Sequence, residues 1–158
     1  LTGGEPLLYP AECLEVISLF PESLILMETN GTVKDGLTAA LLERVDIWSV
    51  DIKLPSVTGL DCFQNHMDFL EALKTRKSVA LKAVFSPETP ESELRQAYQL
   101  AMYYHNSCGG NLQMVYQPLS DGKTVKLGEN LKIVMDIAEK SLFPVRVIPQ
   151  IHKMLDIP

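Results

Sequence analysis

The chain has 158 residues, a formal net charge of −6 and an apolar content of 46%. This length and composition predict one compact domain with a substantial core, and they exclude a disordered or fibrous protein. The acidic balance without a basic cluster argues against nucleic acid as a partner, and the lack of an 18-residue apolar run or a basic leader predicts a cytoplasmic protein without a membrane span.

Helix-like and strand-like segments alternate along the chain. Apolar spacing from about Pro10 to Phe20 predicts a first helix, and residues 23–28 then have the pattern of a buried strand. Further helices are expected at 35–44, 60–70, 90–104 and 129–142, further strands at 47–54, 79–85, 112–117 and 145–148, and a surface turn at 119–126. This alternation predicts an α/β fold with a parallel sheet covered by helices, either doubly wound or curved into a barrel.

Polar residues follow the carboxyl ends of the expected strands, where parallel α/β folds build their sites. They are Glu28 to Thr32, then Asp51 and Lys53, Ser86 and Glu88, Gln117, and finally Gln150 and His152. One such residue is usually only solvated, but polar residues at five strand ends favour a functional site.

One expected strand carries charge in its middle. Ser49, Asp51 and Lys53 share one face because side chains alternate, while the apolar residues between them share the other face. A buried Asp needs a partner, such as Lys53, a metal ion or a ligand. Lys82 has the same placement in the next strand. The alternative is an Asp–Lys bridge that only satisfies itself.

The chain opens with Leu1-Thr2-Gly3-Gly4-Glu5-Pro6, a glycine-rich turn after an apolar strand end. Two glycines let the backbone approach a ligand closely, and the Glu carboxylate is suited to receive an ammonium group. Because Leu1 stands at what would be the last turn of a strand, we expect a fragment whose preceding segment is missing.

Five motifs together resemble those of the radical S-adenosylmethionine (SAM) superfamily. They are Gly3-Gly4-Glu5-Pro6, Glu28-Thr29-Asn30-Gly31-Thr32, Asp51-Ile52-Lys53, Gln117-Pro118-Leu119 and Val147-Ile148-Pro149-Gln150-Ile151-His152-Lys153. Their order and spacing are similar to those of the activases and of the 7-carboxy-7-deazaguanine synthases, and the last two motifs favour the synthase branch. The resemblance implies that residues 1–158 form a partial (β/α)6 barrel that lacks its first strands.

The resemblance also implies a role for each matched position. Gly3, Gly4 and Glu5 would hold the amino group of SAM, and Thr29 or Asn30 would lie near its ribose. Oxygen atoms of Glu28, Thr29, Ser49 and Asp51 would surround a cation, either monovalent or Mg²⁺.

Lys53 and His152 are the candidate catalytic residues by the same resemblance, because they would reach the SAM carboxylate or the substrate. Gln117 and Gln150 would donate and accept hydrogen bonds in the cofactor site. Lys82 is a weaker candidate on the same inner face.

Reductive cleavage of SAM by a 4Fe–4S cluster is the implied reaction, and it gives a 5′-deoxyadenosyl radical. In the synthase branch this radical acts on the small molecule 6-carboxy-5,6,7,8-tetrahydropterin. The resemblance also implies an electron donor, such as flavodoxin or ferredoxin, and a possible homodimer. The cluster ligands of the family, Cys-x3-Cys-x2-Cys, precede the Gly-Gly-Glu-Pro turn. Cys13, Cys62 and Cys108 lack this spacing, so we expect ordinary thiols and an inactive chain on its own.

Three alternatives stay open on the sequence. Lys53 or Lys82 on an inner strand face could be the amine of a Schiff-base aldolase. The chain could be a non-catalytic remnant that binds protein, or, within the superfamily, an activase that makes a glycyl radical in a partner.

Overall fold

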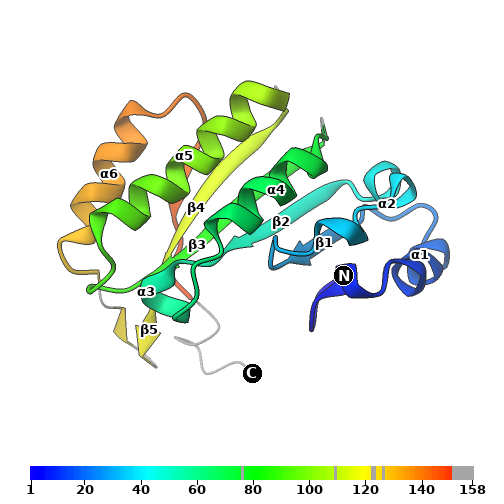
Figure 1. The fold of residues 1–158 in the computed structure, drawn as a ribbon, viewed down its shortest axis with the longest axis horizontal. Helices are drawn as coiled ribbons and strands as arrows, with labels where there is room; N and C mark the ends of the chain where they lie inside the picture. Colours follow the sequence, from blue (N-terminus) through cyan, green and yellow to red (C-terminus); the bar gives the residue numbers. More distant parts are fainter. Residues whose placement is uncertain (76, 109, 122–123, 126, 151–158) are drawn as a thin grey trace.

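A parallel sheet of five strands forms the centre of the protein (Figure 1). The computed structural model describes residues 1–75, 77–108, 110–121, 124–125 and 127–150. The strands are β1 (Leu26–Thr29), β2 (Ile47–Ile52), β3 (Ser78–Phe85), β4 (Leu112–Pro118) and β7 (Val145–Val147), and they lie side by side in that order. The parallel α/β fold expected from the sequence is confirmed.

The described strands show no reversal of strand order, and a partial barrel stays a prediction. A doubly wound sheet reverses its strand order at a switch point, whereas the described strands follow one another across the sheet without reversal. Right-handed crossovers in a constant direction place the connecting helices on one face. Figure 1 shows α4, α5 and α6 side by side across that face.

The helices begin and end near the expected positions. They are α1 (Pro10–Ser18), α2 (Ala39–Arg44), α3 (Pro55–Thr58), α4 (Phe63–Leu73), α5 (Glu91–Cys108) and α6 (Asn130–Lys140), with short 3-10 turns η1 (Pro6–Leu8) and η2 (Lys34–Gly36). Of the described helices, none is both long enough and apolar enough to cross a membrane.

Several boundaries differ from the sequence prediction: β1, for example, begins at Leu26 rather than at residue 23. Three of the differences have a local reason. Helix α2 begins at Ala39, four residues later than expected, because the Thr38 side chain caps it by accepting a hydrogen bond from the Leu41 N–H. Strand β2 stops at Ile52, since Pro55 starts the extra helix α3. Within 119–126, the two-residue strands β5 (Ser120–Asp121) and β6 (Thr124–Val125) pair antiparallel.

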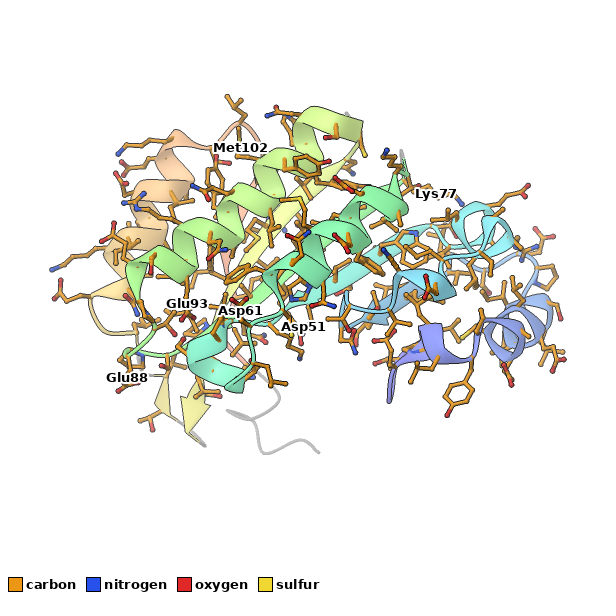
Figure 2. All side chains as sticks on the ribbon, in the orientation of Figure 1. Asp51, Asp61, Lys77, Glu88, Glu93 and Met102 are labelled. Carbon is orange, nitrogen blue, oxygen red and sulfur yellow. The ribbon has the colours of Figure 1, made fainter. Side chains whose placement is uncertain are left out.

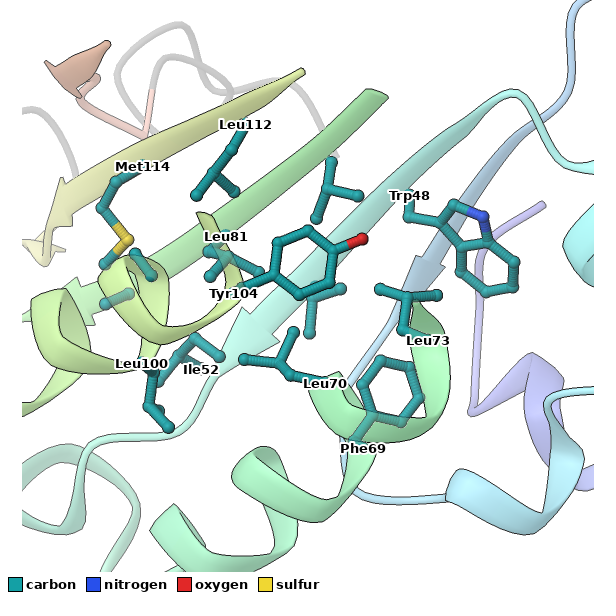
Figure 3. Close-up of a cluster of buried hydrophobic side chains, with 14 of the residues drawn as sticks. Trp48, Ile52, Phe69, Leu70, Leu73, Leu81, Leu100, Tyr104, Leu112 and Met114 are labelled. Atoms are coloured by element: carbon teal, nitrogen blue, oxygen red, sulfur yellow. The ribbon is translucent and has the colours of Figure 1, made fainter. Parts of the chain in front are cut away.

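One face of the sheet is buried under the helices. Trp48, Val50 and Ile52 of β2 are at most 1% exposed, so the predicted alternation along this strand is confirmed. Figure 3 shows side chains from α4 and α5, including Leu70 and Tyr104, packed against these strands. Burying each such side chain contributes about 1.5–3 kcal/mol, which holds α4 and α5 on the sheet.

The opposite face of the sheet carries the polar side chains. Glu28 of β1 pairs in register with Ser49 of β2, and Asp51 of β2 pairs with Lys82 of β3. Glu28 is exposed, and the other three residues are half-buried. The fold therefore gathers charged groups from three neighbouring strands on a face that the described helices do not cover.

Candidate functional site

A cavity of about 160 Å³ lies on this polar face, near the carboxyl ends of β1 and β2. Its lining residues are Thr2, Gly3, Gly4, Glu28, Thr29, Asn30, Ser49, Asp51, Lys53 and Lys82. Eight of the twelve residues predicted to bind a cofactor are in this set, and Lys82, the weaker candidate, joins them. Residues far apart in the sequence thus meet at one place.

A larger hollow of about 440 Å³ lies between α4 and α5, on the helical side of the sheet. Its lining consists mainly of amide side chains and apolar side chains, among them those of Gln64, Gln96, Gln99, Met67 and Leu100. We place the candidate site in the smaller cavity, because that one brings together two lysines, two carboxylates and the glycine turn.

Asp51 forms the charged centre of the cavity, and Figure 2 labels it near the end of β2. Its Oδ2 atom lies 2.5 Å from the Lys53 Nζ atom, whereas its Oδ1 atom lies 3.9 Å from the Lys82 Nζ atom. The second distance is too long for a hydrogen bond. Within the described part of the chain, the buried Oδ1 atom has no hydrogen-bond partner. The Asp51–Lys53 bridge therefore satisfies only half of the carboxylate.

The glycine turn borders the cavity with backbone alone. Gly3 and Gly4 have φ angles of +95° and +59°, which favour glycine, and a Cβ added at either would meet no heavy atom within 4 Å. Leu1 donates its N–H to the Leu26 carbonyl and accepts from the Glu28 N–H, 2.5 and 2.9 Å away. These two hydrogen bonds hold the start of the glycine turn against β1.

Glu5 turns away from the cavity and joins the glycine turn to β1. Its carboxylate is 9% exposed and is not among the groups that line the cavity. The Oε1 atom accepts from the Leu7 N–H and the Thr29 hydroxyl at 3.1 and 2.8 Å, and Oε2 accepts from the Asn30 N–H at 2.7 Å. In this structure Glu5 organises the cavity wall; its contact with the amino group of SAM stays a prediction.

His66 of α4 does not line the cavity but bonds to Lys53, which does, and the sequence reasoning missed it. It is fully buried, its Nε2 atom accepts from the Lys53 N–H at 2.9 Å, and its Nδ1–H donates to the Gly31 carbonyl at 2.9 Å. Because one ring nitrogen accepts a hydrogen bond and the other donates one, the imidazole is neutral. Burial lowers the pKa of His66 from its ordinary value of 6.5. The available signal was the i, i+3, i+7 spacing of Phe63, His66 and Leu70, which places the histidine on the buried helix face.

The remaining predicted residues lie apart from the cavity. Gln150 is buried, and its Oε1 atom accepts from both the N–H and the hydroxyl of Ser120 at 3.1 Å. Gln117 is partly buried near the end of β4 and does not line the cavity. His152 lies outside the described residues. The roles of these three residues stay predictions.

The thiols and carboxylates of the described residues form no cluster of three or more that could hold a metal ion. Cys13, Cys62 and Cys108 are free, and burial raises the pKa of the Cys13 thiol. The described residues therefore do not provide the ligands of a 4Fe–4S cluster. Glu28, Thr29, Ser49 and Asp51 do line one cavity, although the Thr29 hydroxyl already bonds to Glu5 and Gly31. A cation there stays a prediction.

A parallel sheet with helices on one face defines an α/β protein, and the charged cavity near its strand ends is a candidate site for a small polar ligand. Three curated relatives are each 31% identical to the chain, and each is named 7-carboxy-7-deazaguanine synthase. The matches cover 98% of the chain and 61% of the Geobacter sulfurreducens protein, 99% and 59% for Methanopyrus kandleri, and 99% and 67% for Thermoplasma acidophilum.

The chain thus spans about 60% of the length of the first two of these relatives. No family model matches it, and no solved structure matches it. The identity and the coverage show that the chain belongs to the 7-carboxy-7-deazaguanine synthase family of radical SAM proteins.

Proposed function

We propose that this chain forms the SAM-binding part of a 7-carboxy-7-deazaguanine synthase. The observation that supports this most directly is the cavity, which combines the open backbone of Gly3 and Gly4 with charges of both signs. Lys53 and Lys82 supply two positive groups, and Glu28 and Asp51 supply two negative ones. Such a mixed site suits a ligand that carries an ammonium group, a carboxylate and hydroxyl groups in one molecule.

In this proposal the residues of the cavity bind SAM and orient it. The unpartnered Asp51 Oδ1 atom accepts a hydrogen bond from a ligand hydroxyl or ammonium group, which removes the cost of its burial. Lys82, held 3.9 Å from that oxygen, is free to turn its ammonium group toward a ligand carboxylate. When bound, SAM and a 4Fe–4S cluster supply a one-electron reductive cleavage that begins hydrogen abstraction from the substrate. The described residues offer the cluster no ligands, so their roles in this proposal are to bind and orient SAM.

The sheet belongs, in this proposal, to a partial (β/α)6 barrel whose interior is the polar face. The uninterrupted strand order and the helices on one face support this arrangement. The name of the relatives gives the product, 7-carboxy-7-deazaguanine. The substrate we propose, from the family resemblance of the sequence, is 6-carboxy-5,6,7,8-tetrahydropterin, which would contract to this 7-deazapurine with loss of ammonia.

Calorimetric titration of the 158-residue chain with SAM tests the binding proposal. We compare the unmodified chain with Lys82→Met, which removes a cation that lines the cavity, and with Lys132→Met, which removes a cation whose side chain is 77% exposed on α6. A charge-assisted hydrogen bond contributes about 1.5–3 kcal/mol, so the Kd should rise about tenfold or more in Lys82→Met alone. Absence of SAM binding, or equal affinity in both variants, would contradict the proposal.

The substrate is tested separately on the SAM-loaded chain. We expect 6-carboxy-5,6,7,8-tetrahydropterin to bind more tightly than tetrahydropterin without the carboxylate. Equal binding of both, or binding of neither, would leave SAM binding in place while removing the carboxypterin as the substrate of this site.

A further inference from the structure

One hydrogen-bonded chain runs through the three segments that surround the cavity. The Glu5 carboxylate accepts from the Thr29 hydroxyl, and this hydroxyl accepts from the Gly31 N–H at 3.2 Å. The Gly31 carbonyl accepts from His66, which in turn accepts from the Lys53 N–H. The glycine turn, the end of β1 and the end of β2 are therefore joined through three buried side chains, those of Glu5, Thr29 and His66.

His66 holds its two neighbours at a fixed separation because both ring nitrogens are used. Its side chain is fully buried, so neither hydrogen bond can be exchanged for one with water without opening the structure. The imidazole enters from α4, which is otherwise held on the sheet by apolar side chains such as Phe69 and Leu73. A packed helix thus fixes two loops that carry cavity residues.

Gly31 fits this contact closely. Its φ angle is +65°, and a Cβ added to it would lie 2.5 Å from the Val50 Cγ1 atom and 3.2 Å from the His66 Nδ1 atom. The β1 loop therefore lies against both β2 and the imidazole, with no room for another methyl group. This close fit gives the Gly31 carbonyl one position relative to the ring.

We propose that His66 is a positioning residue of the site, which holds the Lys53 backbone and the turn at 29–31 in the arrangement that binds the ligand. Its link to SAM affinity rests on the proposed function, whereas its effect on Lys53 does not. Lys53 follows the end of β2, and its ammonium group forms the ion pair with Asp51, so a shift of its backbone moves both charges at the centre of the cavity.

Three substitutions separate the two hydrogen bonds of His66. In His66→Gln the amide reaches the position of Nε2 and can accept from the Lys53 N–H. In His66→Asn the amide reaches the position of Nδ1 and can donate to the Gly31 carbonyl. His66→Phe fills the space and keeps neither bond. His105→Phe is the matched control, because His105 lies on α5 against the Phe143 ring and outside the cavity lining.

The measurement is hydrogen exchange of single backbone amides in the 158-residue chain, followed by SAM titration of the same variants. We expect the Lys53 amide to exchange about fivefold faster or more in His66→Phe and His66→Asn, to stay close to the parent rate in His66→Gln, and to be unchanged in His105→Phe. The amides of β3 should keep their rates in all four variants. SAM affinity should fall in the same order as the protection of Lys53.

Each alternative result has a distinct meaning. Faster exchange throughout β2 and β3 would show a packing role only and would overturn the proposal, as would equal Lys53 rates in the Gln and Asn variants. If His66→Phe does not fold, these last two variants still decide the question. If the unmodified chain does not bind SAM, the proposed function fails, and the Lys53 rates alone decide the role of His66.

Discussion

Gly31 offers the sharpest test of how the cavity is built. Replacing it with alanine adds one methyl group at a residue with a φ angle of +65°, 2.5 Å from the Val50 side chain. Two penalties result: a left-handed backbone costs an alanine about 1–2 kcal/mol, and overpacking a filled site costs about 1–3 kcal/mol. We expect Gly31→Ala to lower the free energy of unfolding by about 2–5 kcal/mol.

Gly59→Ala is the matched control, because it carries the backbone penalty without the collision. Gly59 has a φ angle of +75°, and a Cβ added there meets no heavy atom within 4 Å. Both substitutions also reduce the entropy of the unfolded chain by the same amount. The difference between the two variants therefore isolates the close contact and should be about 1–3 kcal/mol.

Urea unfolding followed by tryptophan fluorescence measures both variants. Trp48 is the single tryptophan of the sequence and is fully buried, so its emission reports the loss of the sheet. Equal losses of stability in the two variants would refute the reasoning, because the β1 loop would then have room for a methyl group beside Val50 and His66.

Three further predictions use the same unfolding assay. Burial lowers the pKa of His66, the Gly31 hydrogen bond and the Asp51 charge oppose this shift, and the Lys53 charge supports it. The unfolded chain therefore binds a proton more readily, so stability should be full above about pH 6.5 and fall as the pH decreases below it. His66→Gln should lack this dependence, and an identical pH profile would contradict the assignment. Tyr116→Phe removes a buried hydroxyl that donates to the Leu94 carbonyl at 2.6 Å and should cost about 1–2 kcal/mol, whereas Tyr98→Phe should cost less than about 0.5 kcal/mol. Asn130→Asp should destabilise more than Asn130→Ala, because the Asn130 amide donates to the carbonyls of Ser86 and Thr89 and a carboxylate would repel them; the reverse order would show that this amide does not hold the loop after β3.

The sequence alone determined the class of fold and most of the cavity lining. Alternation of apolar and polar residues depends only on local backbone geometry, so the two faces of β2 could be assigned before any partner strand was known. The rule that parallel strands build sites at their carboxyl ends then selected Glu28, Asp51 and Lys53 together, and all three line the cavity. The glycine turn was identified by resemblance.

Only the tertiary structure decided which of these groups face a ligand and which hold the walls. Glu5 bonds to Thr29, 24 positions away, and His66 bonds to Gly31, 35 positions away. No periodicity in the chain encodes such pairs, because they depend on how two loops and a helix meet once the sheet has formed. The strand order, which shows no reversal among the described strands, is likewise a long-range property. Local pattern fixes which face a side chain occupies, whereas packing fixes its partner.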